Sequence, residues 1–255
     1  MFKFLLNKIP RPLLIKTSLY LRPIADLFFR GKGTIDPING RSYRKFLPYG
    51  YKQLRPGALS PGTISLERHR ALWLFLQRHT DFFTQADRKI LHIAPEQAFF
   101  KRFKKLFGKN YITVDLYSPI ADVKADITAL PFEDDSFDVI LCNHVLEHIE
   151  NDRKAMSELY RVMKPGGYGI FQIPLDASRP QTFEDPAITD PDERTKIFGQ
   201  YDHVRIYGMD YFKRLQSAGF HTEAIRVKDL FSPEEIKRYA LDENEIIPFV
   251  KKPNL

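Results

Sequence analysis

Residues 126–167 read DITALPFEDDSFDVILCNHVLEHIENDRKAMSELYRVMKPGG, and the change of pattern within this stretch decides the fold. Residues 137–143 form an almost continuous apolar run, which is typical of a strand buried on both faces. Residues 152–163 then place apolar side chains at helical spacing, and the Lys-Pro-Gly-Gly run that follows ends the helix. A buried strand followed by an amphipathic helix is the repeating unit of a parallel sheet covered by helices.

The same alternation extends in both directions from this stretch. Ser65 and Ser232 are candidate N-caps, and the last two strands can pair antiparallel at the edge of the sheet. The predicted strands are 89–93, 111–115, 122–125, 137–143, 168–173, 221–227 and 245–251, and the predicted helices are 65–83, 96–106, 152–163, 209–218 and 232–239. We therefore expect an α/β fold with a mostly parallel sheet and helices on both of its faces.

Ligands of such a sheet bind beyond the carboxyl ends of its strands. The residues at those positions are Ala94, Pro95, Glu96, Asp115, Asp126, Ile127, Asn143 and His144. Asp115 follows the first turn by about twenty residues, where a carboxylate accepts hydrogen bonds from ribose hydroxyls. Asp126 is placed to accept from an adenine amino group. Either acid alone is readily explained as a turn residue or helix cap, but their joint placement favours a nucleoside ligand.

Several elements of residues 126–167 occur together, in order: LPF, SFD, LEH and RVMKPGG. With them the chain resembles the class I S-adenosylmethionine-dependent methyltransferases, in particular the type 11-like group. The resemblance is close over residues 89–175 and looser in the tail. It implies a seven-stranded Rossmann-like sheet with an antiparallel last strand, S-adenosylmethionine as the cofactor, and methyl transfer as the reaction.

The first turn departs from the family pattern, which usually reads Asp-x-Gly-x-Gly. His92 stands in place of the acid, and Ala94-Pro95-Glu96 replaces the glycine pair. Ala94 is still small, and Pro95 suits the first turn of a helix whose N-terminus receives the methionine carboxylate. Glu96 is expected to contact the cofactor's amino group instead of the missing acid. We expect an altered but working site, with a dead enzyme as the alternative.

A second resemblance lies upstream, in the run FLPYGYKQLRPGALSPGTISLERHRALWLFL of residues 46–76. It is similar to a smaller methyltransferase group whose N-terminal module is a zinc ribbon with two Cys-Pro-x-Cys knuckles. The matching positions are 36–39 (Asp-Pro-Ile-Asn) and 60–63 (Ser-Pro-Gly-Thr), so all four thiolates are replaced. Tight zinc binding needs about four such ligands. We therefore expect a metal-free module held by hydrogen bonds and by packing of Phe46, Tyr49 and Tyr51, and no metal in the chain.

Candidate residues for methyl transfer follow from the chemistry. The leaving thioether is neutral, so alignment matters most, and a hydroxyl acceptor is helped by a base of near-neutral pKa such as histidine. His144 follows the fourth predicted strand. His203 and Arg205 lie in the run DHVRIYG, at the end of a polar, proline-rich insertion of residues 176–207 that resembles the acceptor-covering loop of related enzymes. They are candidates for base and anchor; the alternative is a helix cap beside an Asp202–Arg205 surface pair.

Charge and cysteine content limit the partners. Cys142 is the only cysteine, which excludes an internal disulfide and a cysteine zinc site and suits a reducing, cytoplasmic setting. Residues 1–56 carry a balance of +10, and the rest of the chain is mildly acidic. Interruptions by Lys and Arg argue against a membrane span or secretory signal in residues 1–30. These basic amphipathic helices either pack on the protein or lie peripherally on a membrane.

The expected organisation is a basic helical segment (1–30), a zinc-ribbon-like module (31–64) and a methyltransferase domain (65–255). The expected function is methyl transfer to a small-molecule or glycan-type acceptor. A nucleic-acid methyltransferase is less favoured, because aromatics are not interleaved with the basic residues as in a nucleic-acid module. The third alternative is a non-catalytic interaction protein that keeps the fold.

Overall fold

The computed structural model describes residues 22–50, 54–85 and 87–254, and the chain forms two compact units. One unit joins Met1–Phe83 to Val227–Glu245, and the other joins Thr84–Arg226 to Ile246–Leu255. The basic helices expected in residues 1–30 lie mostly outside the described residues, as does Tyr51. Each unit is described by itself below.

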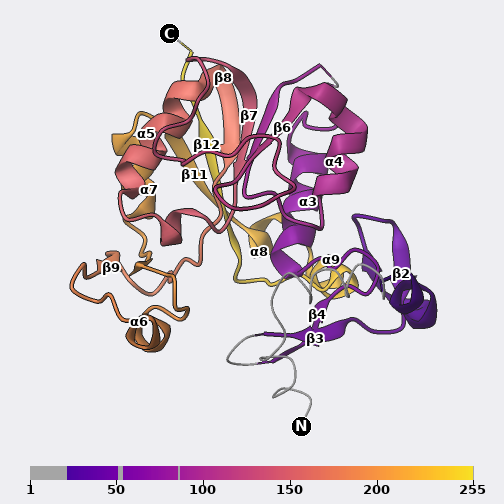
Figure 1. The fold of residues 1–255 in the computed structure, drawn as a ribbon. Helices are drawn as coiled ribbons and strands as arrows, with labels where there is room; N and C mark the ends of the chain where they lie inside the picture. The colour runs from indigo at the N-terminus through magenta and orange to yellow at the C-terminus, as the bar shows by residue number, and fades with distance from the viewer. Residues whose placement is uncertain (1–21, 51–53, 86, 255) are drawn as a thin grey trace. The chain divides into compact units, whose positions relative to one another are not determined.

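The larger unit is built on a six-stranded sheet with the order β11-β12-β8-β7-β5-β6 (Figure 1). Its strands are β5 (Ile90–Ile93), β6 (Tyr111–Val114), β7 (Phe137–Cys142), β8 (Met163–Ile170), β11 (His221–Arg226) and β12 (Ile246–Lys251). β5 pairs in parallel with both β6 and β7, and β7 pairs in parallel with β8. Only β12 runs against its neighbours in this sheet, as an antiparallel strand between β8 and β11. The expected mostly parallel, Rossmann-like sheet is confirmed.

The sheet has six strands among the described residues, and the seven implied by the family resemblance are not found. Residues 122–125 make a single parallel bridge, Val114↔Val123, in place of a further strand. The cause is the side chain of Asp122, which accepts hydrogen bonds from the backbone nitrogen (3.0 Å) and the hydroxyl (2.8 Å) of Thr113. A backbone donor that a side chain occupies is lost to the strand ladder.

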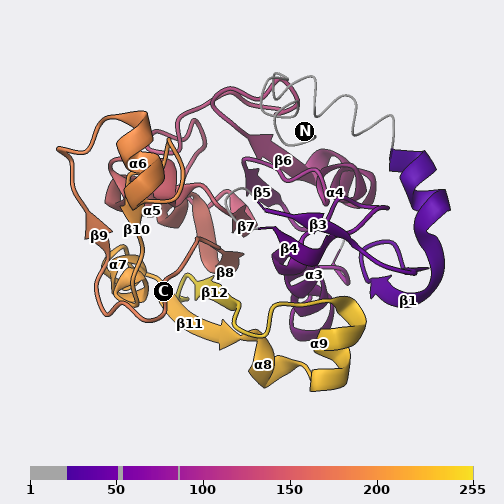
Figure 2. The ribbon, with the colours of Figure 1, turned by 90° about the horizontal axis from the view of Figure 1, so that it is seen from below.

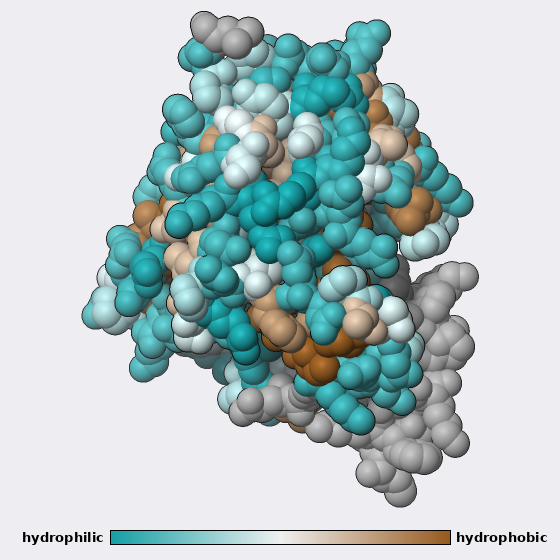
Figure 3. Space-filling model, turned by 90° about the vertical axis from the view of Figure 1, so that its left-hand side faces the viewer, coloured by the Kyte–Doolittle hydropathy of each residue, from teal (hydrophilic) through white to brown (hydrophobic). Residues whose placement is uncertain are grey.

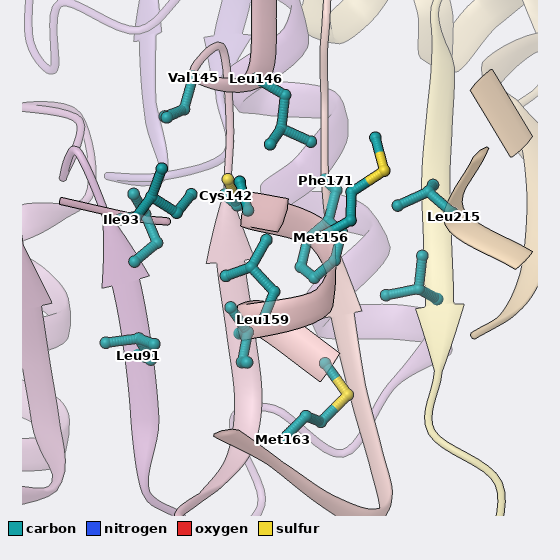
Figure 4. Close-up of a cluster of buried hydrophobic side chains, with 14 of the residues drawn as sticks. Leu91, Ile93, Cys142, Val145, Leu146, Met156, Leu159, Met163, Phe171 and Leu215 are labelled. Carbon is teal, nitrogen blue, oxygen red and sulfur yellow. The ribbon is translucent and has the colours of Figure 1, made fainter. Parts of the chain in front are cut away.

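Helices cover this sheet around an apolar core (Figure 4). The helical segments of the unit are α4 (Phe100–Phe107), η1 (Gly108–Asn110), η2 (Leu146–His148), α5 (Asp152–Val162), α6 (Pro191–Ile197) and α7 (Tyr211–Ser217). α5 begins where the sequence predicts, because the side chain of Asn151 caps the backbone nitrogen of Lys154. Leu159 of α5 packs in the core with Leu91 and Cys142 of the strands. The core therefore fixes the strand ends that matter below.

α4 begins later than predicted. The prediction placed the helix start next to Pro95, but residues 97–99 form a turn and α4 starts at Phe100. The carbonyl of Glu96 accepts from the backbone nitrogens of Phe99 (3.0 Å) and Phe100 (2.9 Å). At the same time the side chain of Glu96 turns back to His92. The prediction that Pro95 occupies the first turn of the helix is therefore wrong.

Among its described residues the smaller unit contains two antiparallel hairpins and four helical segments (Figure 2). Its elements are β1 (Arg30–Asp36), β2 (Arg41–Tyr43), β3 (Leu47–Tyr49), β4 (Arg55–Leu59), α3 (Glu67–His79), α8 (Val227–Leu230) and α9 (Pro233–Tyr239), and residues 22–29 are also helical. α9 carries the predicted Ser232 cap in a reciprocal capping box with Glu235. Ser65 does not cap α3: the cap position is Leu66, and the Ser65 hydroxyl points to Asp36 at 3.5 Å.

Asp36 is the polar centre of the smaller unit. Its carboxylate is fully buried and accepts hydrogen bonds from the hydroxyls of Ser60 and Thr63 and from the backbone nitrogen of Ile38. Three of the four positions matched to zinc-ribbon cysteines thus meet through hydrogen bonds. Phe46 is buried as expected, whereas Tyr49 is 47% exposed and does not pack in the core of the module.

Arg70 of α3 is the second polar group buried in this unit. Its guanidinium donates to the backbone carbonyls of Ala58, Ser65, Tyr239 and Ala240, all within 2.9 Å. The guanidinium also lies over the ring of Phe46, 4.7 Å from its centroid. Burial lowers the pKa of Arg70 to about 10. One side chain therefore joins β4, the start of α3 and the end of α9.

The insertion after β8 has little regular structure apart from α6 and a short antiparallel pair, β9 (Phe183–Glu184) with β10 (Arg205–Ile206). Figure 3 shows a mostly hydrophilic face on which hydrophobic residues form several separate patches. Within the described part of the chain, no helix combines the length and apolarity that crossing a membrane requires.

Candidate functional site

The chain takes a left-handed turn after both β5 and β7. Ala94 has a φ of 48° and His144 a φ of 54°, although neither is glycine. This conformation costs a residue with a Cβ about 1–2 kcal/mol. Such strain persists only where the surroundings enforce it, and it gathers at functional sites. Here the backbone nitrogen of Ala94 donates to the Val114 carbonyl (2.8 Å), and that of His144 to the Gln172 carbonyl (2.7 Å).

Glu96 lies where these two turns meet. One oxygen of its carboxylate, Oε2, is 3.0 Å from Nε2 of His92 and 3.1 Å from Nδ2 of Asn143. His92 is fully buried, and its Nδ1 contacts the hydroxyl of Tyr111 at 2.7 Å. The family pattern usually has an acid at the position of His92. Here Glu96, four residues later, supplies a carboxyl group that is held at the end of the same strand, β5. The structure brings together His92, Glu96 and Asn143, which the sequence analysis predicted as site residues.

Asp115 and Asp126 each form a turn with one carboxylate oxygen. Oδ1 of Asp115 accepts from the backbone nitrogens of Tyr117 and Ser118, both at 2.7 Å. Oδ1 of Asp126 accepts from the nitrogen and the hydroxyl of Thr128, both at 2.8 Å. Among the described residues neither Oδ2 accepts a hydrogen bond. Both acids therefore act as turn residues through Oδ1, and Oδ2 of each carboxylate remains available to a ligand. Ile127, the residue that follows Asp126, is buried in the core.

His144 is paired with an acid that the sequence analysis did not select. Its Nδ1 lies 3.3 Å from Oε1 of Glu147 in η2. Glu147 is 1% exposed. Burial opposes ionisation of this carboxyl, but the hydrogen bond and charge of His144, with the charge of His148, outweigh it and lower the pKa of Glu147. An ionised Glu147 orients the His144 ring and leaves Nε2 as its proton acceptor.

His203 is a further neighbour of Glu147, with a ring nitrogen within 4.8 Å of a carboxylate oxygen of Glu147. It is 4% exposed, its Nδ1 contacts the carbonyl of Phe198 (3.3 Å), and its ring meets that of His148 edge-on with centroids 4.7 Å apart. Burial lowers the pKa of His203, so this ring is neutral at neutral pH. The structure therefore joins His144 and His203 through Glu147, whereas the sequence analysis treated the two histidines as separate candidates.

Arg205 is committed to the protein itself. Its guanidinium donates to the carbonyls of Leu146, Ile149 and Glu150 and to the carboxylate of Glu184. The side chain is 4% exposed. These contacts tie the end of the insertion to η2, which is a positioning role. They do not support the predicted role as an anchor that touches the acceptor.

The sequence contained one signal for Glu147. Residues 144–148 read His-Val-Leu-Glu-His, and the spacing His-x-x-Glu-His occurs in zinc hydrolases when it lies on a helix. Here residues 146–148 form only a 3₁₀ turn. The contact with His203 comes from a distant segment, and no local pattern predicts it.

Comparison with known proteins identifies the central part of the chain. Residues 77–171 match the family model described as a methyltransferase domain. This range contains β5, β6, β7 and α5, and with them the residues from His92 to Glu147. The prediction that this chain is an enzyme with a methyltransferase domain is confirmed.

Individual relatives match over shorter stretches. An uncharacterized methyltransferase of Mycolicibacterium vanbaalenii is 29% identical over 147 residues, which are 51% of this chain and 55% of that protein. A demethylmenaquinone methyltransferase of Clavibacter sepedonicus is 51% identical over 45 residues, 18% of each chain. The chain thus spans about half the length of the first relative and under a fifth of the second.

A solved structure covers more of the chain. The [4+2]-cyclase SpnF aligns with a TM-score of 0.52 at 14% identity, over 94% of this chain and 96% of that chain. At this identity the likeness shows the fold alone. That fold also serves chemistry other than the one named by the family model.

Proposed function

We propose that this enzyme transfers the methyl group of S-adenosylmethionine to a small-molecule or glycan-type acceptor. The observation that carries the proposal is the carboxylate of Glu96, held by His92 and Asn143 at the ends of β5 and β7 inside a methyltransferase domain. A carboxylate at this position is suited to bind the ammonium group of the cofactor's methionine. It offers this contact although the first turn contains no glycine.

The remaining cofactor contacts are proposed on the same strand ends. The left-handed turn at Ala94 brings the backbone, with only a methyl side chain, to the end of β5. The unengaged oxygen of Asp115 is suited to the ribose hydroxyls, and that of Asp126 to the adenine amino group. Ile127 and the residues around it would supply an apolar surface for the base.

Methyl transfer from a sulfonium is an in-line displacement in which the leaving thioether becomes neutral. The protein must align the acceptor with the methyl carbon and exclude water. His144, next to the strand end that carries Asn143, is proposed to take the acceptor's proton at Nε2 while Glu147 holds its Nδ1. Arg205 positions this pair by fixing η2 to the insertion.

Two observations support a small acceptor over a nucleic acid. The polar atoms at the proposed acceptor side belong to buried or half-buried groups, His144, Glu147 and His203, rather than to an exposed basic surface. In addition, the demethylmenaquinone methyltransferase of Clavibacter sepedonicus, which matches 45 residues of this chain, is named for a small-molecule acceptor. Weak dependence of acceptor binding on salt would support this class, since nucleic-acid binding falls steeply with salt.

Titration of the purified full chain with S-adenosylmethionine tests the proposal, and two variants at position 94 sharpen it. Ala94→Val puts a β-branched side chain in a left-handed conformation and should weaken cofactor affinity at least about tenfold. Ala94→Gly removes the strain, at some cost in chain entropy, and should keep affinity within about threefold. Isothermal titration calorimetry measures all three proteins.

Circular dichroism of both variants controls for folding in that experiment. A wild-type chain that shows no binding at about 1 mM cofactor would refute the methyltransferase proposal. Equal affinities for the Val and Gly variants would show that the turn after β5 does not approach the cofactor. In that case the cofactor would have to bind elsewhere on the sheet.

We propose for the smaller unit that it is a zinc-ribbon-like module stabilised without metal. What supports this is the convergence of Ser60 and Thr63 on the buried carboxylate of Asp36, at positions where related modules carry cysteines. Asp36→Asn replaces an acceptor oxygen by a donor facing two hydroxyls, so it should lower the free energy of unfolding by about 2–4 kcal/mol. Urea denaturation measures this loss.

The matched control for Asp36 is Glu243→Gln, which removes an exposed charge from the same unit and should change stability by less than about 0.5 kcal/mol. Elemental analysis of the wild-type chain for zinc bound in this unit completes the test. The larger unit contains a separate group of possible metal ligands, Glu147, His148 and His203, so the zinc analysis is repeated on a chain in which these three residues are replaced. Zinc that remains in that chain would contradict the metal-free module.

A further inference from the structure

Three potential metal ligands meet where η2 faces the loop before β10. Glu147, His148 and His203 each offer one ligand atom, and these atoms lie within 4.8 Å of one another. Ligands of one tetrahedral zinc ion are about 3.4 Å apart, given bonds of about 2.1 Å. A small contraction of the three side chains would therefore let them hold a single ion.

The cluster contains buried polar atoms that nothing else in the described chain satisfies. Apart from the approach of His144 Nδ1 to Oε1 at 3.3 Å, the carboxylate oxygens of Glu147 have no hydrogen-bond partner among the described residues, and Nε2 of His203 has none. Nε2 of His144 and Oδ1 of Asp202 are buried beside them in the same state. A buried charge without hydrogen bonds costs several kcal/mol, so such groups are normally paired or coordinate a metal.

Hydrogen bonds select the ring nitrogen that each histidine can offer. Nδ1 of His203 contacts the carbonyl of Phe198 (3.3 Å), and Nδ1 of His148 contacts the carbonyl of Asp202 (3.2 Å). A carbonyl only accepts, so the proton of each ring is on Nδ1 and the lone pair is on Nε2. Metal-binding histidines usually show this arrangement, because the second nitrogen donates to a carbonyl and fixes the ring.

Hydrogen bonds join the two backbone segments that carry the cluster, residues 146–150 and residues 203–205. The nitrogen of Val204 donates to the carbonyl of Glu147 (2.9 Å), and Arg205 donates to the carbonyls of Leu146 and Glu150. Two segments far apart in the sequence are thereby held in one arrangement. A site that keeps its ligands in place before the ion arrives loses less entropy on binding.

We propose that Glu147, His148 and His203 bind a divalent transition-metal ion, with zinc the best match to the donor set. Two imidazoles and one carboxylate with an open position are the ligands of catalytic zinc sites. The open position would take the oxygen of a hydroxyl-bearing acceptor. This last part rests on the proposed function, whereas the binding of the ion does not.

The balanced step is an O-methylation. The metal-bound hydroxyl gives its proton to Nε2 of His144, and its oxygen attacks the methyl carbon of the sulfonium. The C–O bond forms as the S–C bond breaks, and the bonding pair stays on sulfur, which leaves as neutral S-adenosylhomocysteine. The ion stabilises the charge that develops on the acceptor oxygen.

The experiment titrates the full-length protein, stripped with a chelator, with Zn²⁺ by calorimetry and with Co²⁺ by visible absorption. Wild type should bind stoichiometrically with a Kd at or below about 1 μM, and bound Co²⁺ should show the intense bands of a low-coordinate site. His203→Gln and Glu147→Gln should each weaken Zn²⁺ binding at least about 100-fold. His148→Gln, which changes a half-buried side chain, should do so without loss of fold.

The control is His221→Gln, which removes an exposed histidine on β11 and should leave metal affinity unchanged. A wild-type protein that takes up no Zn²⁺ at about 100 μM, or whose affinity is the same in His148→Gln, overturns the proposal. A titration with S-adenosylmethionine separates the two proposals: protein that binds cofactor but no metal refutes only the metal site. Protein that binds metal but no cofactor keeps the metal site and refutes the methyltransferase activity.

Discussion

His144→Asn should lower kcat for methyl transfer by about 10²–10⁴-fold, the usual contribution of a positioned general base. Asparagine is the suitable replacement, because it tolerates the left-handed backbone at this position, where φ is 54°. It keeps a polar side chain next to Glu147 but has no nitrogen that accepts a proton. The loss should therefore appear in kcat, measured as S-adenosylhomocysteine formed at saturating acceptor and cofactor.

His221→Gln serves as the control for this prediction as well, since it removes an exposed histidine far along the chain. Cofactor affinity of His144→Asn should stay within about threefold of wild type, because the contacts of Glu96 and Asp115 are unchanged. Turnover close to the wild-type rate would show that His144 is not the base. The proton would then leave the acceptor without help from this residue.

Arg70→Met should be the most destabilising change in the smaller unit, with a loss of about 3–5 kcal/mol in the free energy of unfolding. Methionine fills much of the same volume, so the effect reports the guanidinium rather than a cavity. The change leaves the carbonyls of Ala58, Ser65, Tyr239 and Ala240 without their donor in a buried place. Urea denaturation followed by two spectroscopic probes measures the loss and tests whether the units unfold together.

Arg55→Met is the matched control. Arg55 forms an ion pair with Glu67 in the same unit, but it is 50% exposed, and such pairs contribute about 0–1 kcal/mol. Arg70→Lys should recover only part of the stability, because an ammonium group has three donors and cannot satisfy all four carbonyls. A loss below about 1 kcal/mol in Arg70→Met would contradict the role assigned to this side chain.

The fold was predictable where the apolar residues follow a clear strand or helix periodicity. β7 and α5 match their predicted ranges to within a residue, because a continuous apolar run and a capped amphipathic helix each allow one interpretation. The errors came from side chains that compete with the backbone. Asp122 takes the hydrogen bonds of a predicted strand, and Glu96 turns toward His92 so that the following helix starts later. Such competition depends on neighbours that a local pattern does not contain.

The candidate site was predictable in the same uneven way. Ala94, Glu96 and Asn143 follow from the rule that ligands bind at the carboxyl ends of parallel strands, which needs only strand positions. The proximity of Glu147 to His203 depends on how the chain runs through the insertion of residues 176–207. The apolar periodicity of the sequence does not determine that course. The histidines are predictable as residue types suited to acid–base chemistry, but the position of Glu147, between Leu146 and His148, does not by itself indicate that this acid joins them.

The position of β12 has a consequence for synthesis on the ribosome. β12 lies between β8 and β11, although β11 precedes it in the chain. Until residues 246–251 emerge, β8 has an unsatisfied edge and β11 has no place to dock, so the nascent chain exposes a surface prone to aggregation. The intervening residues 227–245 belong to the other unit. Neither unit can therefore be finished during translation before the other is nearly complete, and chaperone dependence should be greatest late in elongation.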